Sequence, residues 1–272
     1  KGFTKNSVQY CSFLKKTTFD YIFLCAWQNW STDLFFQIDL NYSPKIILFS
    51  HCISTNEIYF KNFISSLLRY LFWRFYWWTL SSKINRLDGI VFLENCSSST
   101  RFDDLKKAKK LKVKKFFIPN SFSALANFKL KKQPKKFLKR SQISAVGAYN
   151  WQKGFDFVLK AYSKSKANNK VIIKFFGFEE TRYIIHLEKL RKKLKISQDY
   201  VKFCVGFKEE ELLDEYENSK ILLFGSYSEC QPLSLVNACV TGTPFIARNS
   251  GAITNMPGGK VVFTVNEMSF QI

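Results

Sequence analysis

Residues 219–247 contain the side chains best placed to do chemistry. A short apolar run at residues 221–224 is followed by a polar break that holds one acid, Glu229, and then by apolar residues at helical spacing. The sequence Gly242-Thr243-Pro244 ends this helix, and a further apolar run begins a second strand. A strand, a tight turn and a helix start leave free backbone N–H groups at the end of a sheet, where an anion can bind. A carboxylate beside that anion site suits a ligand that carries both phosphate and sugar-like hydroxyl groups.

A second candidate element precedes this one in the chain. Residues 143–147 have the composition of a strand that ends in glycine, and Lys153-Gly154 opens a helix predicted to reach Ser165. Two further apolar runs, residues 171–177 and 201–207, also place a glycine near the end of a predicted strand. In parallel sheets ligands bind beyond the carboxyl ends of the strands, where these turns lie.

Together these motifs resemble the donor site of retaining glycosyltransferases of family 4, which have the GT-B fold. The first match is S-x-x-E-x-x-P-L-x-L-x-x-A-x-x-x-G-x-P-x-I-A over residues 226–247, and the second is V-G-A-x-x-x-x-K-G-x-D over residues 146–156. Two positions depart from the family pattern. Ala148 stands where the family has Arg after the glycine, and Asn237 stands where a second Glu follows Glu229. The likeness covers residues 141–264 and is looser over residues 20–121.

The resemblance implies a role for each matching residue. Lys153 would bind the diphosphate of a nucleotide sugar, Glu229 would contact the hydroxyls of the donor sugar, and His51 would contact donor or acceptor as a third catalytic residue. His51 follows a predicted strand, and without the resemblance it is an ordinary loop histidine. The implied donor-binding positions are Gly147, Gly154, Gly206, Phe207, Gln231, Leu233, Ser234 and Asn237. Of these, Gly206 and Phe207 would line the base pocket, and residues 231, 233 and 234 would offer backbone N–H groups to the phosphates.

Alternation of predicted strands and helices along the chain indicates an α/β fold with parallel sheets. With the resemblance, we expect two Rossmann-like domains that face each other across a cleft. Residues 1–118 would be a partial, acceptor-side domain, residues 119–140 a linker, and residues 141–272 the donor-binding domain without its final helix. The sequence Pro119-Asn120-Ser121 is similar to the P-N-G that leads out of the family's N-terminal domain. We therefore interpret the chain as a fragment of a longer protein.

The charge of the chain points to polyanionic partners. Lys and Arg number 42 against 21 Asp and Glu, which leaves a formal net charge of +21. Nucleic acid, an acidic membrane face and phosphorylated ligands all fit such a charge, as does a simple compositional bias toward lysine. The seven cysteines form no C-x-x-C pair and indicate reduced thiols in the cytoplasm. With two histidines in the chain, no metal site is expected.

The aromatic stretch at residues 63–80 is long enough to suggest a membrane helix. Arg69 and Arg74 lie inside it, and a charge near the bilayer centre costs at least about 2.5 kcal/mol, so we do not expect it to span. An interfacial helix with an aromatic body and a basic edge fits better, and a helix packed on the sheet is the alternative. The lysine-rich residues 106–115 add charge that would favour an anionic leaflet, or would simply face solvent.

From the resemblance we expect a hexosyltransferase-type enzyme that moves a sugar from a nucleoside diphosphate sugar to a glycan or lipid-linked acceptor, with retention. We expect the enzyme to act in surface polysaccharide biosynthesis, in the cytoplasm at the inner membrane face. We expect no cofactor besides the donor and no nucleic-acid partner. Ala148 and Asn237 motivate an alternative, a degenerate GT-B protein that binds nucleotide or membrane without transfer. The charge alone motivates a further alternative, a basic nucleic-acid-binding protein.

Overall fold

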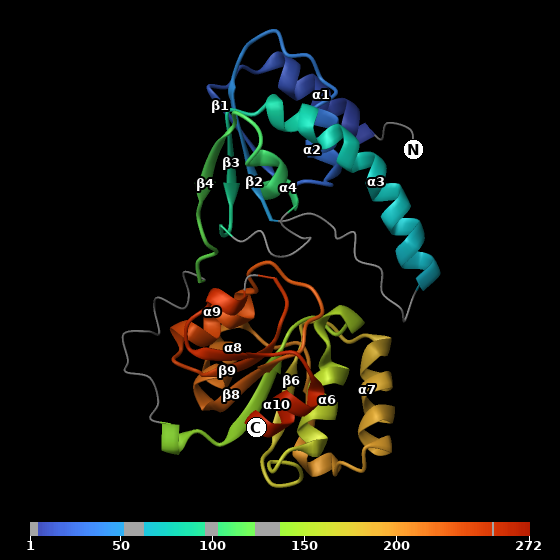
Figure 1. The fold of residues 1–272 in the computed structure, drawn as a ribbon, viewed down its shortest axis with the longest axis vertical. Helices are drawn as coiled ribbons and strands as arrows, with labels where there is room; N and C mark the ends of the chain where they lie inside the picture. Colours follow the sequence, from blue (N-terminus) through green and yellow to red (C-terminus); the bar gives the residue numbers. More distant parts are fainter. Residues whose placement is uncertain (1–4, 52–62, 96–102, 123–136, 252) are drawn as a thin grey trace. The chain divides into compact units, whose positions relative to one another are not determined.

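The computed structural model describes residues 5–51, 63–95, 103–122, 137–251 and 253–272. The chain divides into two compact units, Lys1–Pro119 and Asn120–Ile272 (Figure 1). Each unit is built on its own sheet, and every strand pair in both sheets is parallel. The predicted fold class, α/β with two Rossmann-like parallel sheets, is therefore confirmed.

The sheet of the N-terminal unit has the order β1-β2-β3-β4. Its strands are β1 (Tyr21–Cys25), β2 (Lys45–Ser50), β3 (Gly89–Phe92) and β4 (Lys114–Phe117). Its helices are α1 (Lys5–Lys16), α2 (Trp30–Phe35), α3 (Phe63–Asn85) and α4 (Asp103–Ala108). Only β3 is buried along its whole length, whereas β1 alternates between buried and exposed residues and β4 begins with two lysines and is mostly exposed.

One face of the N-terminal sheet carries the core of this unit. In β1 the residues alternate, so that Ile22 and Leu24 are buried while Tyr21 and Phe23 are exposed. Leucine and isoleucine side chains of α1–α4 are buried with the inward residues, and in Figure 1 these helices gather on one side of β1–β4. Among the described residues, the face of β1 that bears Tyr21 and Phe23 is left without a covering helix.

The sheet of the C-terminal unit has the order β10-β9-β8-β5-β6-β7. Its strands are β5 (Gln142–Val146), β6 (Ile173–Phe176), β7 (Val201–Cys204), β8 (Ser219–Phe224), β9 (Phe245–Arg248) and β10 (Gly259–Val262). Its helices are α6 (Phe155–Lys164), α7 (Arg182–Lys193), α8 (Glu209–Asn218), α9 (Leu233–Val240) and α10 (Val265–Gln271). Short 3-10 turns lie at Phe137–Lys139, Trp151–Lys153, Gln198–Tyr200 and Ile253–Asn255.

Both faces of the C-terminal sheet are covered (Figure 1). One core cluster joins the sheet to α6, α7 and α10 through residues such as Val158, Leu187 and Met268. The other joins it to α8 and α9 through Leu212 and Leu235. Burial on both faces is most complete in β5 and β6, whereas β7 and β10 are partly exposed.

The structure also corrects several expectations. The helix expected to open at Lys153 begins at Phe155 after a 3-10 turn. A helix, α10, follows β10, although no helix was expected there. Cys230 is disulfide-bonded, so the prediction of reduced thiols is wrong for this residue. A single pairing has no characteristic spacing, which is why the sequence does not indicate it. The other described cysteines, Cys11, Cys25, Cys204 and Cys239, are free thiols.

Candidate functional site

The candidate site lies where the strand order of the C-terminal sheet reverses. From β5 the chain builds β6 and β7 on one side, and β8, β9 and β10 on the other. At such a reversal the loops that follow the two central strands diverge and leave room for a ligand beyond the strand ends. Here the two central strands are β5 and β8, which pair directly. The loop after β5 carries Lys153 and the loop after β8 carries Glu229.

Lys153 is held by the turn in which it lies. It ends the 3-10 turn Trp151–Lys153, and its backbone N–H donates to the side chain of Asn150, the N-cap residue, at 3.2 Å. The aliphatic stem of Lys153 packs over Gly147, where an added Cβ would lie 3.3 Å from Cγ of Lys153. Gly147 therefore has a local function that the sequence analysis did not include, which is to leave space for the lysine stem.

Glu229 is the acidic partner of Lys153. Nζ of Lys153 lies 2.7 Å from Oε1 of Glu229, and the two side chains are 31% and 13% exposed. Oγ of Ser226 lies 2.7 Å from the same carboxylate oxygen and 3.0 Å from the carbonyl oxygen of Gln152, so its hydroxyl can donate to either acceptor. Among the described residues, Oε2 of Glu229 accepts no hydrogen bond. The carboxylate thus keeps one oxygen for an incoming hydroxyl donor.

Two glycines bring the loops of the site into backbone contact. Gly154 has φ +62°, and a Cβ there would lie 2.0 Å from the carbonyl oxygen of Gly225. Gly251 has φ +64°, and a Cβ there would lie 1.9 Å from the carbonyl oxygen of Glu229. Any side chain at either position would push these loops apart. Gly154 was predicted to allow close approach of a ligand, and the structure shows that the backbone of Gly225 is its near neighbour.

The start of α9 supplies the backbone donors that the sequence analysis indicated. Pro232 is the N-cap residue, and Leu233 and Ser234 are the first two helical positions. The N–H groups of Leu235 and Val236 already donate to the carbonyl of Pro232. Because the first N–H groups of a helix have no intrahelical acceptor, those of Leu233 and Ser234 remain for an anion. This helix start directly follows Glu229 in the same loop.

Gln231 is tied to Asn120, a contact that the sequence analysis did not foresee. The backbone N–H of Asn120 donates to Oε1 of Gln231 at 2.5 Å, and its side-chain amide donates to the carbonyl oxygen of Gln231 at 2.9 Å. The Pro119-Asn120-Ser121 motif was the available signal, although nothing in it indicates which residue Asn120 contacts. Asn120 therefore fixes the loop just before α9.

The remaining predicted donor-binding residues lie on neighbouring elements of the same unit. Gly206 follows β7 with φ +72°, and an added Cβ would meet no atom within 4 Å. The ring centroid of Phe207 lies 5.0 Å from that of Phe178, a 62% exposed residue two positions after the end of β6. Asn237 lies in α9, one turn beyond Leu233. Ala148 follows Gly147 with no basic side chain to offer.

His51, the third predicted catalytic residue, belongs to the N-terminal unit. It directly follows β2 and is exposed. The neighbouring Ser50 is buried and its hydroxyl donates to the carboxylate of Asp104, as does Nε1 of Trp27 at 3.0 Å. Burial raises the pKa of Asp104 to about 6, against the lowering effect of these donors. The residue before His51 therefore contacts a buried carboxyl that the sequence did not mark.

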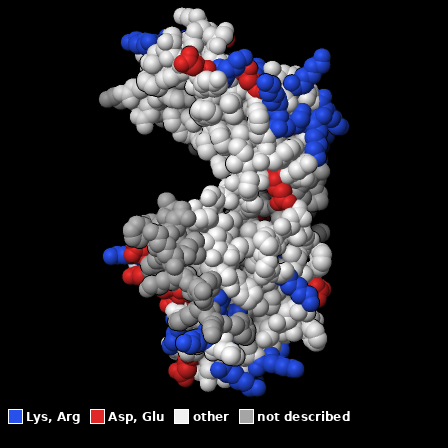
Figure 2. All heavy atoms as spheres, turned by 90° about the vertical axis from the view of Figure 1, so that its left-hand side faces the viewer, with Lys and Arg blue, Asp and Glu red and all other residues white. Residues whose placement is uncertain are grey.

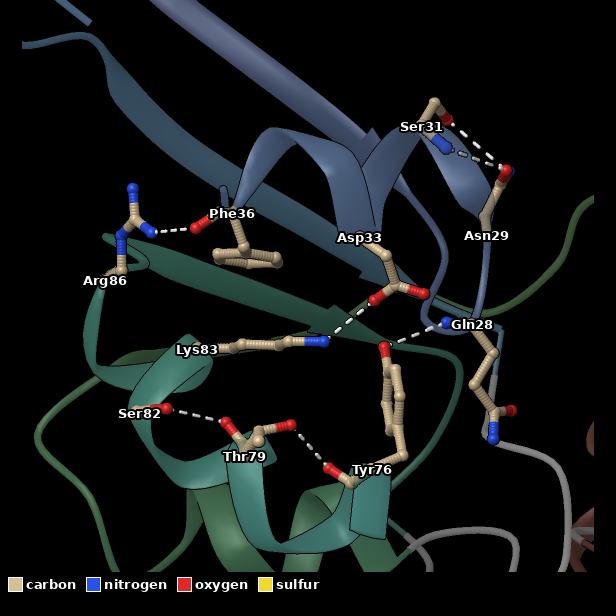
Figure 3. Close-up of polar contacts among 10 residues, drawn as sticks. All are labelled: Gln28, Asn29, Ser31, Asp33, Phe36, Tyr76, Thr79, Ser82, Lys83 and Arg86. Atoms are coloured by element: carbon tan, nitrogen blue, oxygen red, sulfur yellow. Dashed lines mark hydrogen bonds and ion pairs between the residues drawn. The ribbon is translucent and has the colours of Figure 1, made fainter. Parts of the chain in front are cut away.

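A second polar cluster stabilises the same edge of the N-terminal sheet (Figure 3). Gln28, after β1, has φ +59°, and its backbone N–H donates to the hydroxyl of Tyr76 at 3.0 Å. Nζ of Lys83 lies 2.8 Å from Asp33 and 4.0 Å from the centroid of the Tyr76 ring. Figure 3 shows Tyr76 and Lys83, both on α3, reaching toward the loop that follows β1 and toward α2. The cluster attaches α3 to the rest of the unit.

The family comparison agrees with this geometry. Residues 127–257, a little under half of the chain, match the family described as glycosyl transferases group 1. The match contains β5, β8, the Lys153 turn and the Glu229 loop. No match was found among curated proteins by sequence.

Solved structures share the fold of the whole chain. S. aureus TarM is 17% identical with a TM-score of 0.70, covering 99% of this chain and 51% of its own. An E. coli structure described as trehalose-6-phosphate bound with UDP-2-fluoro glucose is 13% identical with a TM-score of 0.71, covering 97% and 67%. Anabaena HepE in complex with UDP is 15% identical with a TM-score of 0.67, covering 97% and 70%.

These comparisons identify the fold of the chain and the family model that its C-terminal unit matches. The chain has the fold of GT-B glycosyltransferases, and its C-terminal unit carries the group 1 glycosyl transferase match. The chain spans about half the length of TarM and about two thirds of the E. coli structure.

Proposed function

We propose that the protein is a glycosyltransferase that moves a sugar from a nucleoside diphosphate sugar to a hydroxyl acceptor with retention of configuration. The observation that carries the proposal is the Lys153–Glu229 contact at the reversal of strand order, next to the start of α9. The group 1 match and the UDP-bound neighbours support the donor class. We assign the donor to the C-terminal unit and the acceptor to the N-terminal unit, where His51 would contact the sugars.

The difficult step in such a transfer is departure of the diphosphate. The bond from the anomeric carbon to the phosphate oxygen breaks and its electron pair remains on the diphosphate. The acceptor oxygen bonds to the same face of the sugar, and its hydroxyl proton passes to the departing diphosphate oxygen. The ammonium of Lys153 and the N–H groups of Leu233 and Ser234 would stabilise the charge on the leaving group. Preorganised groups of this kind usually contribute the largest catalytic effect. A helix start contributes about 0.3–1 kcal/mol when exposed and ~2 when partly buried, so most of the effect would come from Lys153.

In this scheme Glu229 binds rather than attacks. Retaining glycosidases need two carboxylates about 5–5.5 Å apart, one of them a nucleophile. In the described part of the chain, Glu229 is the one carboxylate within 4 Å of Lys153, and the ammonium already neutralises it. We therefore propose that its free oxygen accepts a hydrogen bond from a donor-sugar hydroxyl and that no covalent glycosyl-enzyme forms. Asn237 would accept from the ribose as a neutral partner.

We further propose that α3 attaches the protein to an anionic membrane surface. Five of its exposed apolar residues recur at helical spacing and form one stripe: Ile64, Leu68, Leu71, Phe75 and Trp78. Phe63 and Phe72 of the same helix are exposed as well. The helix contains no acidic residue, and its first half extends beyond the other helices of the unit (Figure 1). The lysines that follow α4 are exposed, and basic side chains gather on this unit in Figure 2. A lipid-linked or surface-glycan acceptor would fit this attachment.

The aromatic stripe favours lipid over nucleic acid as the partner of these charges. An interfacial helix buries an apolar face among lipid headgroups while its basic residues meet anionic lipid. In the described part of the chain, no helix combines the length and apolarity that membrane crossing demands. We accordingly propose peripheral attachment, on the cytoplasmic face of the membrane.

Replacement of Lys153 by alanine in the full-length protein tests the proposal. UDP- and GDP-sugar turnover should be lost, because the leaving diphosphate loses its cation. Lys160→Ala is the matched control, since Lys160 pairs with Asp156 at 3.1 Å on the same stretch of chain and should leave turnover unchanged. Unchanged turnover in Lys153→Ala would remove Lys153 from the mechanism.

Ala148 and Asn237 still favour one other candidate, a protein that binds nucleotide without transfer. Isothermal titration with the same donors separates the two, because donor binding without hydrolysis or transfer in the wild-type protein would support the degenerate form.

A further inference from the structure

Arg248 is a partly buried cation next to the candidate site that no step above uses. It is the last residue of β9, one position beyond Ala247, which pairs with Phe224 of β8. Ile246, two residues earlier, is in the core cluster with α6, so Arg248 points toward the same face of the sheet. The sequence analysis gave this residue no role.

The guanidinium of Arg248 lies over two aromatic rings. Cζ of Arg248 lies 3.9 Å from the ring centroid of Tyr227 and 4.9 Å from that of Phe157. Phe157 lies in the first turn of α6, whereas Tyr227 lies in the loop that carries Glu229. Arginine stacks on aromatic faces through its flat, delocalised guanidinium, and the attraction strengthens when water is excluded.

Stacking, rather than hydrogen bonding or ion pairing, determines where this guanidinium lies. Nη1 of Arg248 is buried without a hydrogen-bond partner, and among the described residues no carboxylate lies within 4 Å of it. A buried N–H group without an acceptor is costly, so a residue kept in this state usually has a function. Leucine or methionine would fill the same space without that cost.

The Glu229 loop is attached on its other side to the Lys153 turn. The backbone N–H of Tyr227 donates to the carbonyl oxygen of Gln152 at 2.9 Å, and its ring lies 6.1 Å from that of Trp151. Ser226, the neighbour of Tyr227, contacts both Gln152 and the carboxylate of Glu229. Tyr227 thus touches both the Lys153 turn and Arg248.

We propose that Arg248 is a positioning residue that holds the Glu229 loop against the Lys153 turn through the ring of Tyr227. It does so without touching the substrate. With Arg248 in place, Ser226 and Glu229 are aligned with Lys153 before the donor arrives, which lowers the ordering cost of donor binding. The catalytic consequence rests on the proposed function, whereas the ordering of the loop does not.

The first experiment measures loop ordering without any ligand. Hydrogen exchange of residues 225–231 is followed by mass spectrometry in the wild-type protein and in Arg248→Ala, Arg248→Lys and Tyr227→Ala. Exchange in this segment should accelerate about tenfold in Arg248→Ala and Tyr227→Ala, with strands β5 and β6 unchanged. Faster exchange throughout the C-terminal unit would overturn the proposal, as would unchanged exchange in residues 225–231. Arg182→Ala is the matched control, because Arg182 is exposed on α7.

The second experiment measures the donor KM and kcat. Arg248→Ala should raise the donor KM about tenfold, and Arg248→Lys should recover only part of this loss because an ammonium lacks the flat face. Tyr227→Phe should behave as wild type, because it keeps the ring. Arg248→Ala combined with Tyr227→Ala should match either single variant, since both remove the same contact. Additive effects in the double variant, or a KM within twofold of wild type in Arg248→Ala, would contradict a role through Tyr227.

The two experiments distinguish failure of the Arg248 proposal from failure of the proposed function. If the wild-type protein neither binds nor turns over UDP- or GDP-sugars, the proposed function is wrong, and the exchange measurement still decides whether Arg248 orders the loop.

Discussion

Nζ of Lys153 lies 2.7 Å from Oε1 of Glu229, although 76 positions separate the two residues in the chain. The contact exists because β5 and β8 are neighbours in the sheet and the loops that follow them meet above it. Each partner keeps capacity for a ligand, since the side chain of Lys153 is 31% exposed and Oε2 of Glu229 is free of hydrogen bonds among the described residues.

Replacement of Glu229 by glutamine should weaken the donor interaction. The amide keeps the size of the side chain but loses the ion pair, and hydrogen bonds to charged groups contribute about 1.5–3 kcal/mol. We expect kcat/KM for the donor to fall by about 10–100-fold. Glu215→Gln is the matched control, because Glu215 pairs with Lys174 at 3.0 Å in the same unit. Equal losses in the two variants would show that the effect of Glu229 is not local to the site.

Two glycines with similar φ should respond differently to alanine. Gly206 has φ +72° and open space, so Gly206→Ala should cost only the backbone strain, about 1–2 kcal/mol in the free energy of unfolding. Gly154 has φ +62°, but its Cβ would lie 2.0 Å from Gly225, so Gly154→Ala should cost at least about 4 kcal/mol. Urea unfolding of both variants measures the difference. Similar losses of unfolding free energy in the two variants would mean that the backbones of Gly154 and Gly225 can move apart at little cost.

The N-terminal unit should lose stability as pH rises through the range where Asp104 ionises. Its pKa is raised to about 6 in the folded protein, so below pH 3.8 the carboxyl is neutral in both states. Between pH 3.8 and about 6 the unfolded chain ionises first, which favours unfolding. At 1.36 kcal/mol per pKa unit, the free energy of unfolding should fall by roughly 3 kcal/mol. The fall should be complete above pH 6.

Asp104→Asn should remove this pH dependence while it keeps an acceptor for Trp27 and Ser50. Unfolding followed by urea titration at pH 4, 5, 6 and 7 gives the comparison. The same slope between pH 4 and 6 in wild type and variant would assign the dependence to another group.

Asn237→Glu should strengthen donor binding. The substitution restores the carboxylate that the resembled family has at this position, and a charged acceptor forms hydrogen bonds roughly twice as strong as a neutral one. We expect the donor Kd to fall by about threefold to tenfold in isothermal titration. Ser234→Ala offers a comparison on the same helix, since its backbone N–H remains. Weaker binding in Asn237→Glu would place residue 237 away from the ribose.

Membrane attachment should depend on the α3 stripe. Phe75→Ser combined with Trp78→Ser should reduce binding to vesicles that contain anionic lipid by about tenfold, because these side chains are 70% and 79% exposed. Phe270→Ser is the control, since Phe270 is 87% exposed on α10, outside the stripe. Flotation at low and high salt measures the change. Equal binding of all variants to the vesicles would contradict the lipid assignment. DNA binding that persists at both low and high salt would contradict it as well.

Much of the fold could be predicted from the sequence because local pattern carries it. The strand predicted at residues 143–147 is observed at Gln142–Val146, and the run at residues 201–207 contains β7 at Val201–Cys204. Helix starts were less accurate, since Lys153 lies in a 3-10 turn capped by Asn150 rather than in α6. The type of a segment follows from its own residues, whereas its ends depend on caps and contacts supplied by neighbours.

The sequence by itself determined which residues carry the charges of the candidate site and which glycines punctuate the loops. Motif spacing placed Lys153 and Glu229 each after a strand, and this is local information. Only the tertiary structure decided that Lys153, Ser226 and Glu229 meet, that Asn120 secures Gln231, and that Arg248 stacks on Tyr227. These contacts follow from the order of strands in the sheet. Strand order is set by packing across the whole unit, so no window of sequence contains it.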